Sequence, residues 1–211
     1  MTTFYRRHGK RLLDLALTIP ALILLAPVMG VVALAVRLTM GRPVLFRQAR
    51  PGLHAVPFTM LKFRTMTDAR DAGGNLLPDA KRLTRLGRFL RRTSLDELPE
   101  LWNVLRGDMS LVGPRPLLMR YLPYFTTDER RRFTILPGIT GLAQVSGRNN
   151  VPWDERLETD VLYANTCSAA LDARILALTV WSFISQKDVV AVPTTVMLSL
   201  DEERSGARHG D

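Results

Sequence analysis

"LALTIPALILLAPVMGVVALAV", residues 15–36, is a run of 22 residues without a charged side chain. A straight helix over this run would reach roughly 33 Å, which is enough to cross the hydrocarbon core of a bilayer. Pro20 and Pro27 interrupt the run, and a proline inside a helix removes a backbone hydrogen bond and kinks the helix. The run therefore predicts a membrane helix, with a break at Ala26-Pro27 as the main question.

Three topologies fit this segment. A cleavable signal peptide would explain the basic start and the small residues at 33–35, but the apolar run is long for one. A spanning helix tolerates prolines. A re-entrant helix, which enters and leaves on one face, is favoured by Pro27 and by basic residues on both flanks, because positive charge holds each flank in the cytoplasm. Composition alone supports the spanning and re-entrant helices equally. The flanking basic residues are Arg6, Arg7, Lys10, Arg11, Arg37, Arg42, Arg47 and Arg50.

The overall composition is that of a globular chain with an anionic partner. The 211 residues are 46% hydrophobic and 23% charged, with a net charge of +9. Such an excess indicates nucleic acid, a phospholipid surface or a phosphorylated substrate, although codon bias in a GC-rich genome would also raise the arginine content. The single cysteine, Cys167, excludes an internal disulfide framework. The sequence contains neither a zinc-like cluster of histidines and cysteines nor a P-loop.

The residues after the apolar run predict a small hairpin followed by helices. Residues 44–47 and 57–65 are strand-like, with Pro51-Gly52 in the turn region, and Lys62 and Arg64 share one strand face. That face would meet either phosphate or water. Helices are expected over residues 152–165 and 171–185, and Thr126 or Thr127 can cap a helix that follows.

These patterns give an α+β chain in three parts. We expect a membrane helix with basic flanks in residues 1–40 and a separate folded domain in residues 41–190. A C-terminal tail follows in residues 191–211, and its polar end, "DEERSGARHGD", is expected to be disordered.

"TSLDELPELWNVLRGDMSLVGPRP", residues 93–116, places two carboxylates at the start of an amphipathic helix. Leu98, Leu101, Trp102 and Leu105 recur at helical spacing, which predicts one buried face, and Gly107 ends the helix. Ser94 and Glu97 match a capping box, so Glu97 has a purely structural explanation, with Asp96 interacting only with the helix dipole.

The same residues also fit phosphoryl transfer. An aspartate kept anionic by a helix N-terminus can attack phosphorus and form an acyl phosphate, which makes Asp96 a candidate nucleophile. A neighbouring glutamate, Glu97, can hold Mg²⁺. Arg91 and Arg115, the latter fixed between two prolines, can bind the non-bridging phosphate oxygens. We therefore predict a basic, membrane-attached phosphoryl-transfer enzyme.

At this point the chain resembles a known family, the small monotopic bacterial phosphoglycosyl transferases, also called bacterial sugar transferases. The motifs that carry the resemblance extend from Lys10 to about Lys187: "KRLLD", "FRQARPGL", "KFRTM", "SLDELPELWNVLRGDMSLVGPRP" and "PGITGLAQVSGRN". The family has a re-entrant membrane helix broken at Ser-Pro and a mostly helical cytoplasmic domain on the membrane interface. Here the break would fall at Ala26-Pro27, and Leu142 and Trp102 also depart from common family residues.

The resemblance implies a reaction and its residues. A sugar 1-phosphate would pass from a UDP-sugar to undecaprenyl phosphate through a covalent aspartyl intermediate, releasing UMP, as the first membrane step of a bacterial surface glycan pathway. Asp96 would be the nucleophile and Glu97 a ligand of Mg²⁺, or of Mn²⁺ in its place. Arg91 and Arg115 would contact phosphate, with Lys62 and Arg148 as further candidates.

The resemblance also implies a location and a set of partners. The enzyme would lie in the bacterial inner membrane, on an anionic phospholipid bilayer, with its catalytic domain on the cytoplasmic face. Nucleic acid is not an expected partner, and the formation of an oligomer is left as an open alternative. Two rival functions are a membrane-bound scaffold without turnover and a phosphotransferase that acts on a lipid head group. Release of UMP from a UDP-sugar separates the expected activity from both rivals.

Overall fold

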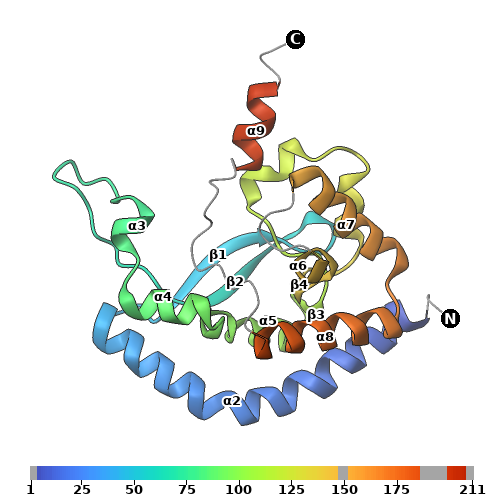
Figure 1. The fold of residues 1–211 in the computed structure, drawn as a ribbon, viewed down its shortest axis with the longest axis horizontal. Coiled ribbons are helices and arrows are strands. Elements are labelled where there is room, and N and C mark those ends of the chain that lie inside the picture. Colours follow the sequence, from blue (N-terminus) through green and yellow to red (C-terminus); the bar gives the residue numbers. More distant parts are fainter. Residues whose placement is uncertain (1–3, 147–151, 186–198, 208–211) are drawn as a thin grey trace.

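The computed structural model describes residues 4–146, 152–185 and 199–207 (Figure 1). It is a mixed structure of helices and short strands, as expected from the sequence. In chain order the elements are η1 (Tyr5–Gly9), α2 (Lys10–Met40), β1 (Leu45–Pro51), η2 (Leu53–Ala55), β2 (Pro57–Phe63), α3 (Asp79–Arg82), α4 (Arg85–Arg92), η3 (Leu95–Glu97), α5 (Glu100–Arg106), β3 (Ser110–Val112), η4 (Met119–Tyr124), η5 (Glu129–Thr134), β4 (Gly138–Thr140), α6 (Leu142–Ser146), α7 (Trp153–Thr166), α8 (Ala169–Ile184) and α9 (Leu200–Ala207).

The apolar run forms one continuous helix, α2, which contains both Pro20 and Pro27. The predicted break at Ala26-Pro27 is therefore wrong as an interruption of the helix. A proline removes only its own N–H donor, so the turns on both sides can keep their hydrogen bonds while the axis bends. Figure 1 shows that bend: α2 bows away from the rest of the molecule in its middle, and both of its ends turn toward the domain.

The buried residues of α2 lie in its two end portions. Lys10, Asp14 and Thr18 are buried near its start, Val32 and Val36 near its end, and residues 19–31 include no buried side chain. Within the described residues, the helix over Tyr5–Met40 is the single one long and apolar enough to cross a membrane. Because both ends pack on one domain, this helix is compatible with a monotopic anchor.

The hairpin forms as predicted but is longer than expected. β1 and β2 pair antiparallel from Leu45↔Phe63 to Pro51↔Pro57, and the short 3-10 helix η2 lies in the connection instead of a tight turn. A second pair, β3 and β4, is parallel and was not predicted. At this pair the backbone approaches closely, since a Cβ on Gly138 would lie 2.0 Å from the Gly113 nitrogen. Glycine is therefore required there.

Three helices line the side of the domain that faces α2, namely α4, α5 and α8 (Figure 1). Each carries large apolar side chains that stay exposed, among them Phe89, Trp102 and Trp181. Helices α7 and α8 begin and end within two residues of the predicted bounds. The exposed apolar residues on this side suit a membrane interface.

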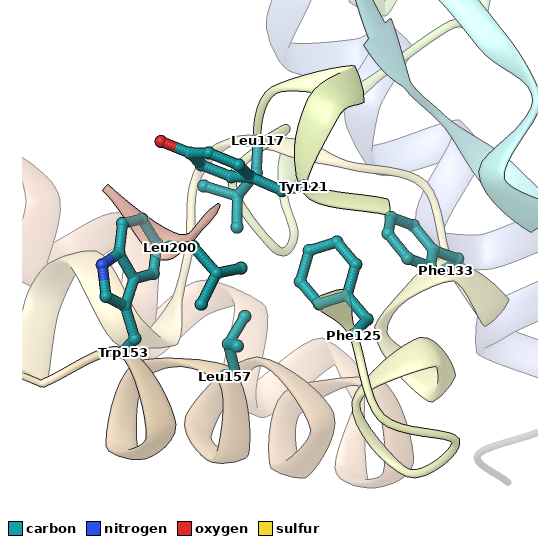
Figure 2. Close-up of a cluster of buried hydrophobic side chains, with 7 residues drawn as sticks. All are labelled: Leu117, Tyr121, Phe125, Phe133, Trp153, Leu157 and Leu200. Atoms are coloured by element: carbon teal, nitrogen blue, oxygen red, sulfur yellow. The ribbon is translucent and has the colours of Figure 1, made fainter. Parts of the chain in front are cut away.

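The largest cluster of buried hydrophobic residues joins the segment 117–133 to α7 and α9. Figure 2 shows its side chains pointing toward one another, with Tyr121 edge-on to Trp153 at 5.7 Å between ring centroids. Leu200 at the start of α9 is fully buried in this cluster. The expected disorder of the polar C-terminal end is therefore wrong for residues 201–207, which are helical. Residues 208–211 lie outside the described residues.

Candidate active site

The two carboxylates predicted to start a helix lie instead in a short 3-10 helix, η3, which precedes α5. Ser94 has a φ of 54° and its side chain caps nothing, so the predicted capping box is wrong. Gly107 ends α5 with a φ of 90°, as predicted. Trp102, predicted to be buried, is 50% exposed. The 3-10 turn leaves Glu97 free of a capping role and directs it to other partners.

Glu97 is held by two cations. Lys62 from β2 donates to its Oε1 at 2.6 Å, and Arg115 donates to the same oxygen at 2.5 Å. Burial alone would raise the pKa of Glu97, but Arg115 and Lys62 outweigh it and lower the pKa to about 2. Glu97 is therefore a carboxylate at neutral pH. Its Oε2 accepts no hydrogen bond from any residue that the structure describes.

A second carboxylate shares Lys62. The Lys62 ammonium lies 3.1 Å from Oε1 of Glu100, a residue only 2% exposed. Burial raises the pKa of Glu100 to about 7; Lys62 opposes the rise and the Glu97 charge adds to it. Glu100 was not among the predicted site residues, because in the sequence it reads as one more polar position of an amphipathic helix.

Asp96 is buried beside this group. Burial and the Glu97 charge raise its pKa, and the charges of Lys62 and Arg91 oppose the rise. Asp96 does not lie in the first turn of an α-helix, as expected, but in a 3-10 turn, where burial is the largest effect on its pKa. Cations close to the carboxylate are what favour its ionised form. Arg91, from the last turn of α4, donates to Thr65 Oγ1 at 3.1 Å.

Arg115 is positioned through its own backbone. Arg132 donates to the Arg115 carbonyl at 2.8 Å, and Arg132 is itself paired with Asp160 at 2.7 Å, both of them buried. Arg50 donates to the Pro116 carbonyl at 3.2 Å. No sequence spacing signals this pair, because Arg132 and Asp160 are 28 residues apart and meet only in the fold.

The structure therefore brings together most of the predicted site. Lys62, Asp96, Glu97 and Arg115 form one cluster, and the charge of Arg91 reaches Asp96. Arg64 binds elsewhere, at the carbonyls of Met40 and Arg42. Arg148 lies outside the described residues. The charged residues near this cluster that the sequence did not reveal as candidates are Arg50, Glu100 and Arg132.

The donor set fits a magnesium ion of the kind that binds with its substrate. Among the described residues no group of three or more histidine, cysteine, aspartate or glutamate side chains is placed to hold a metal. Mg²⁺ usually takes one or two carboxylates and completes its octahedron with water and substrate phosphates. An ionised Glu97 with one unbonded oxygen, next to Asp96, meets that requirement.

The comparisons with known proteins identify the family of the chain. The family model described as "Bacterial sugar transferase" matches residues 5–186, so the chain belongs to the bacterial sugar transferase family. The resemblance drawn from the motifs is confirmed, and the predicted class, a phosphoglycosyl transferase, is confirmed with it.

Three relatives illustrate the match. The chain is 55% identical to "Uncharacterized sugar transferase EpsL" of Bacillus subtilis, over 81% of the chain and 85% of that protein. It is 42% identical to "UDP-glucose:undecaprenyl-phosphate glucose-1-phosphate transferase" of Caulobacter vibrioides, over 83% of the chain and 70% of that protein. It is 39% identical to "Undecaprenyl-phosphate galactose phosphotransferase" of Salmonella typhimurium, over 81% of the chain but only 39% of that protein.

Proposed function

We propose that this enzyme transfers a sugar 1-phosphate from a UDP-sugar to undecaprenyl phosphate and releases UMP. The observation that carries the proposal is a buried Asp96 adjacent to Glu97, which Lys62 and Arg115 hold in place. The activities for which two relatives are named support the same substrates.

The proposed reaction has two steps, which form and then break down a covalent intermediate on Asp96. In the first, a carboxylate oxygen of Asp96 attacks the phosphorus that bears the sugar, the bond to the nucleotide phosphate breaks, and UMP leaves with the electron pair. In the second, an oxygen of undecaprenyl phosphate attacks the same phosphorus and frees the Asp96 carboxylate. Arg91 and Arg115 bind the phosphoryl oxygens where charge accumulates.

Glu97 would hold Mg²⁺ or Mn²⁺ together with oxygens of the substrate diphosphate. The cation, when bound, neutralises phosphate charge near the attacking carboxylate. Lys62 fixes the Glu97 side chain through Oε1, so Oε2 would be available to the cation.

The membrane helix and the exposed apolar residues on α4, α5 and α8 support a membrane location for this reaction. The domain would rest on the cytoplasmic face of the inner membrane, where a soluble UDP-sugar and a lipid phosphate can both reach Asp96. The product would be the first lipid-linked sugar of a surface glycan pathway.

Asp96→Asn tests the nucleophile directly, because a neutral amide cannot attack the diphosphate. With UDP-sugar and Mg²⁺ but no lipid acceptor, the wild type should release up to about one UMP per site and gain a sugar-phosphate mass on the intact protein. Asp96→Asn should show neither signal. Excess EDTA should abolish UMP release by the wild type.

The matched control is Asp128→Asn, since the Asp128 side chain is 82% exposed. It should behave as the wild type. Near-wild-type turnover by Asp96→Asn, or UMP that appears only with the lipid acceptor, would replace the covalent intermediate by direct transfer. Turnover of a lipid head group without UMP release would replace the proposed function itself.

A further inference from the structure

Within the described residues, two arginines on which the charge of Arg115 acts, Arg50 and Arg156, form no ion pair. Arg50, near the end of β1, donates to the Pro116 carbonyl at 3.2 Å and to Gln48 Oε1 at 2.6 Å. Its Nε is buried and makes no hydrogen bond. Its contacts are thus with neutral acceptors only, although it carries a full charge.

Arg156 lies in the first turn of α7. The carboxylate one turn further, Asp160, is already taken by Arg132, which donates to it through Nε and Nη2. The Arg156 guanidinium lies 5.2 Å from the centroid of the Trp153 ring. Among the described residues its guanidinium donates no hydrogen bond.

The charge of Arg115 acts on both side chains. Burial and then Arg115 lower the pKa of Arg50 to about 10, and burial and then Arg115 lower the pKa of Arg156. The contacts place both near the backbone of Arg115: Arg50 donates to the Pro116 carbonyl, and Arg132, which pairs with Asp160 one turn from Arg156, donates to the Arg115 carbonyl. Arg115, although paired with Glu97, thus repels each of these two partly desolvated guanidinium groups. Such an arrangement is costly until an anion enters, and planar guanidinium forks match the oxygens of a phosphate.

The position of these arginines indicates which phosphate they receive. β1 starts near the end of α2 and runs to the region of η4, η5 and α7, which lies on the side of the domain away from the middle of α2 (Figure 1). A lipid phosphate approaches from the side of α2, whereas a nucleotide approaches from solution. The end of β1 and the first turn of α7 are therefore placed for the soluble substrate.

We propose that Arg50 and Arg156, together with Arg115, bind the phosphate of the nucleoside monophosphate portion of the donor, and hold it as it leaves. This inference rests on the proposed function and assigns the nucleotide end of that site. When the bond between the two phosphoryl groups breaks, the electron pair goes to an oxygen of the nucleotide phosphate. Arg50 and Arg156 would stabilise that added negative charge.

Direct binding of UMP tests the assignment without requiring turnover. Isothermal titration of the detergent-solubilised full chain should give a dissociation constant for UMP about tenfold or more higher in Arg156→Gln and in Arg50→Gln than in the wild type. Arg156→Lys should recover part of the affinity. Arg131→Gln, at an arginine whose side chain is 60% exposed, is the matched control and should bind UMP as the wild type does.

Steady-state kinetics then separate the two phosphate sources. The variants should raise the KM for UDP-sugar and leave the KM for undecaprenyl phosphate unchanged, and their melting temperatures report whether they fold. A raised KM for the lipid, or unchanged UMP affinity in folded variants, overturns the inference. Asp96→Asn should still bind UMP. Its loss of turnover therefore tests the proposed function, whereas the UMP titration tests the assignment of Arg50 and Arg156.

Discussion

At the scale of single residues, the main feature of the site is that one lysine serves two carboxylates. Lys62 lies 2.6 Å from Glu97 and 3.1 Å from Glu100, and the two acids differ widely in pKa, about 2 against about 7. Glu97 also forms an ion pair with Arg115, whereas Oε1 of Glu100 is buried and makes no hydrogen bond. At neutral pH the site therefore contains a firmly ionised glutamate beside one that is poised to titrate.

Glu100→Gln should reveal that titration in the stability of the protein. The folded-state pKa, about 7, lies above the ordinary value of 4.5, so between these pH values the folded state binds more protons than the unfolded state. The free energy of unfolding of the wild type therefore falls as pH rises through this window, by an amount on the order of 3 kcal/mol. Glutamine cannot ionise, so the variant should escape this loss.

Thermal unfolding in detergent measures the effect. The melting temperature of Glu100→Gln relative to the wild type should rise from pH 5 to pH 8. Glu158→Gln, at an exposed position of α7, should follow the wild-type profile. Parallel profiles for Glu100→Gln and wild type would contradict the assigned pKa.

The site residues could be predicted where they belong to a sequence motif. They were harder to predict where the fold decides which side chains are in contact. Asp96, Glu97 and Arg115 come from one short stretch, and the structure places Glu97 and Arg115 in contact. The left-handed backbone at Ser94 is what removes the capping box, and no spacing rule contains that information. Arg50 lies in β1 and Arg156 in α7, so only the tertiary fold shows that the charge of Arg115 acts on both.

At the scale of elements, the first turns of α2 are fastened to the domain by the charged residues of "KRLLD". Arg11 donates to the carbonyls of Val104 and Leu105, in the last turn of α5. Asp14 accepts from Ser110 Oγ at 3.0 Å and from the Leu111 nitrogen at 2.9 Å. Arg11 and Asp14, just before the apolar run, therefore attach α2 to α5 and β3.

The deepest of these contacts is the ion pair between Lys10 and Asp172 of α8, at 2.7 Å with both side chains buried. Lys10→Met should destabilise the protein by about 3–5 kcal/mol, because Asp172 would be left as an unpaired buried charge. Adding Asp172→Asn should recover part of the loss. Denaturant unfolding in detergent measures both variants.

Arg7→Met provides the control, since Arg7 is basic and close in sequence but exposed. It should change the free energy of unfolding by less than about 0.5 kcal/mol. A Lys10→Met variant as stable as Arg7→Met would show that the ion pair contributes nothing to holding α2.

Long elements with a clear periodic pattern were predictable, and short elements were not. The hairpin, α7 and α8 follow from alternation and helical spacing. β3 and β4 have three residues each, too few for any period to appear, and they pair across 25 intervening residues. Helix α9 was missed because its sequence is polar, and a single buried leucine, Leu200, with the ion pairs of Arg204 docks it.

At the scale of the whole molecule, the two ends of α2 determine how the protein meets a bilayer. Both ends contact the same domain, so we expect both to face one side of the membrane. Single cysteines in place of Arg7 and of Arg42, in a Cys167→Ser background, should both react with an impermeant maleimide from the same face of oriented inner-membrane vesicles. Reaction from opposite faces would establish a spanning helix.

The buried residues at both ends of α2 have a consequence for how the enzyme finds its lipid. A domain on one tether can swing and tilt over the surface, whereas a domain fastened at two separated points keeps one height and one orientation. Acceptor phosphates all lie at a similar depth among the lipid head groups. With its height fixed, the enzyme would search for them in two dimensions only, and every lateral encounter would bring the acceptor to the same level as the attacked phosphorus.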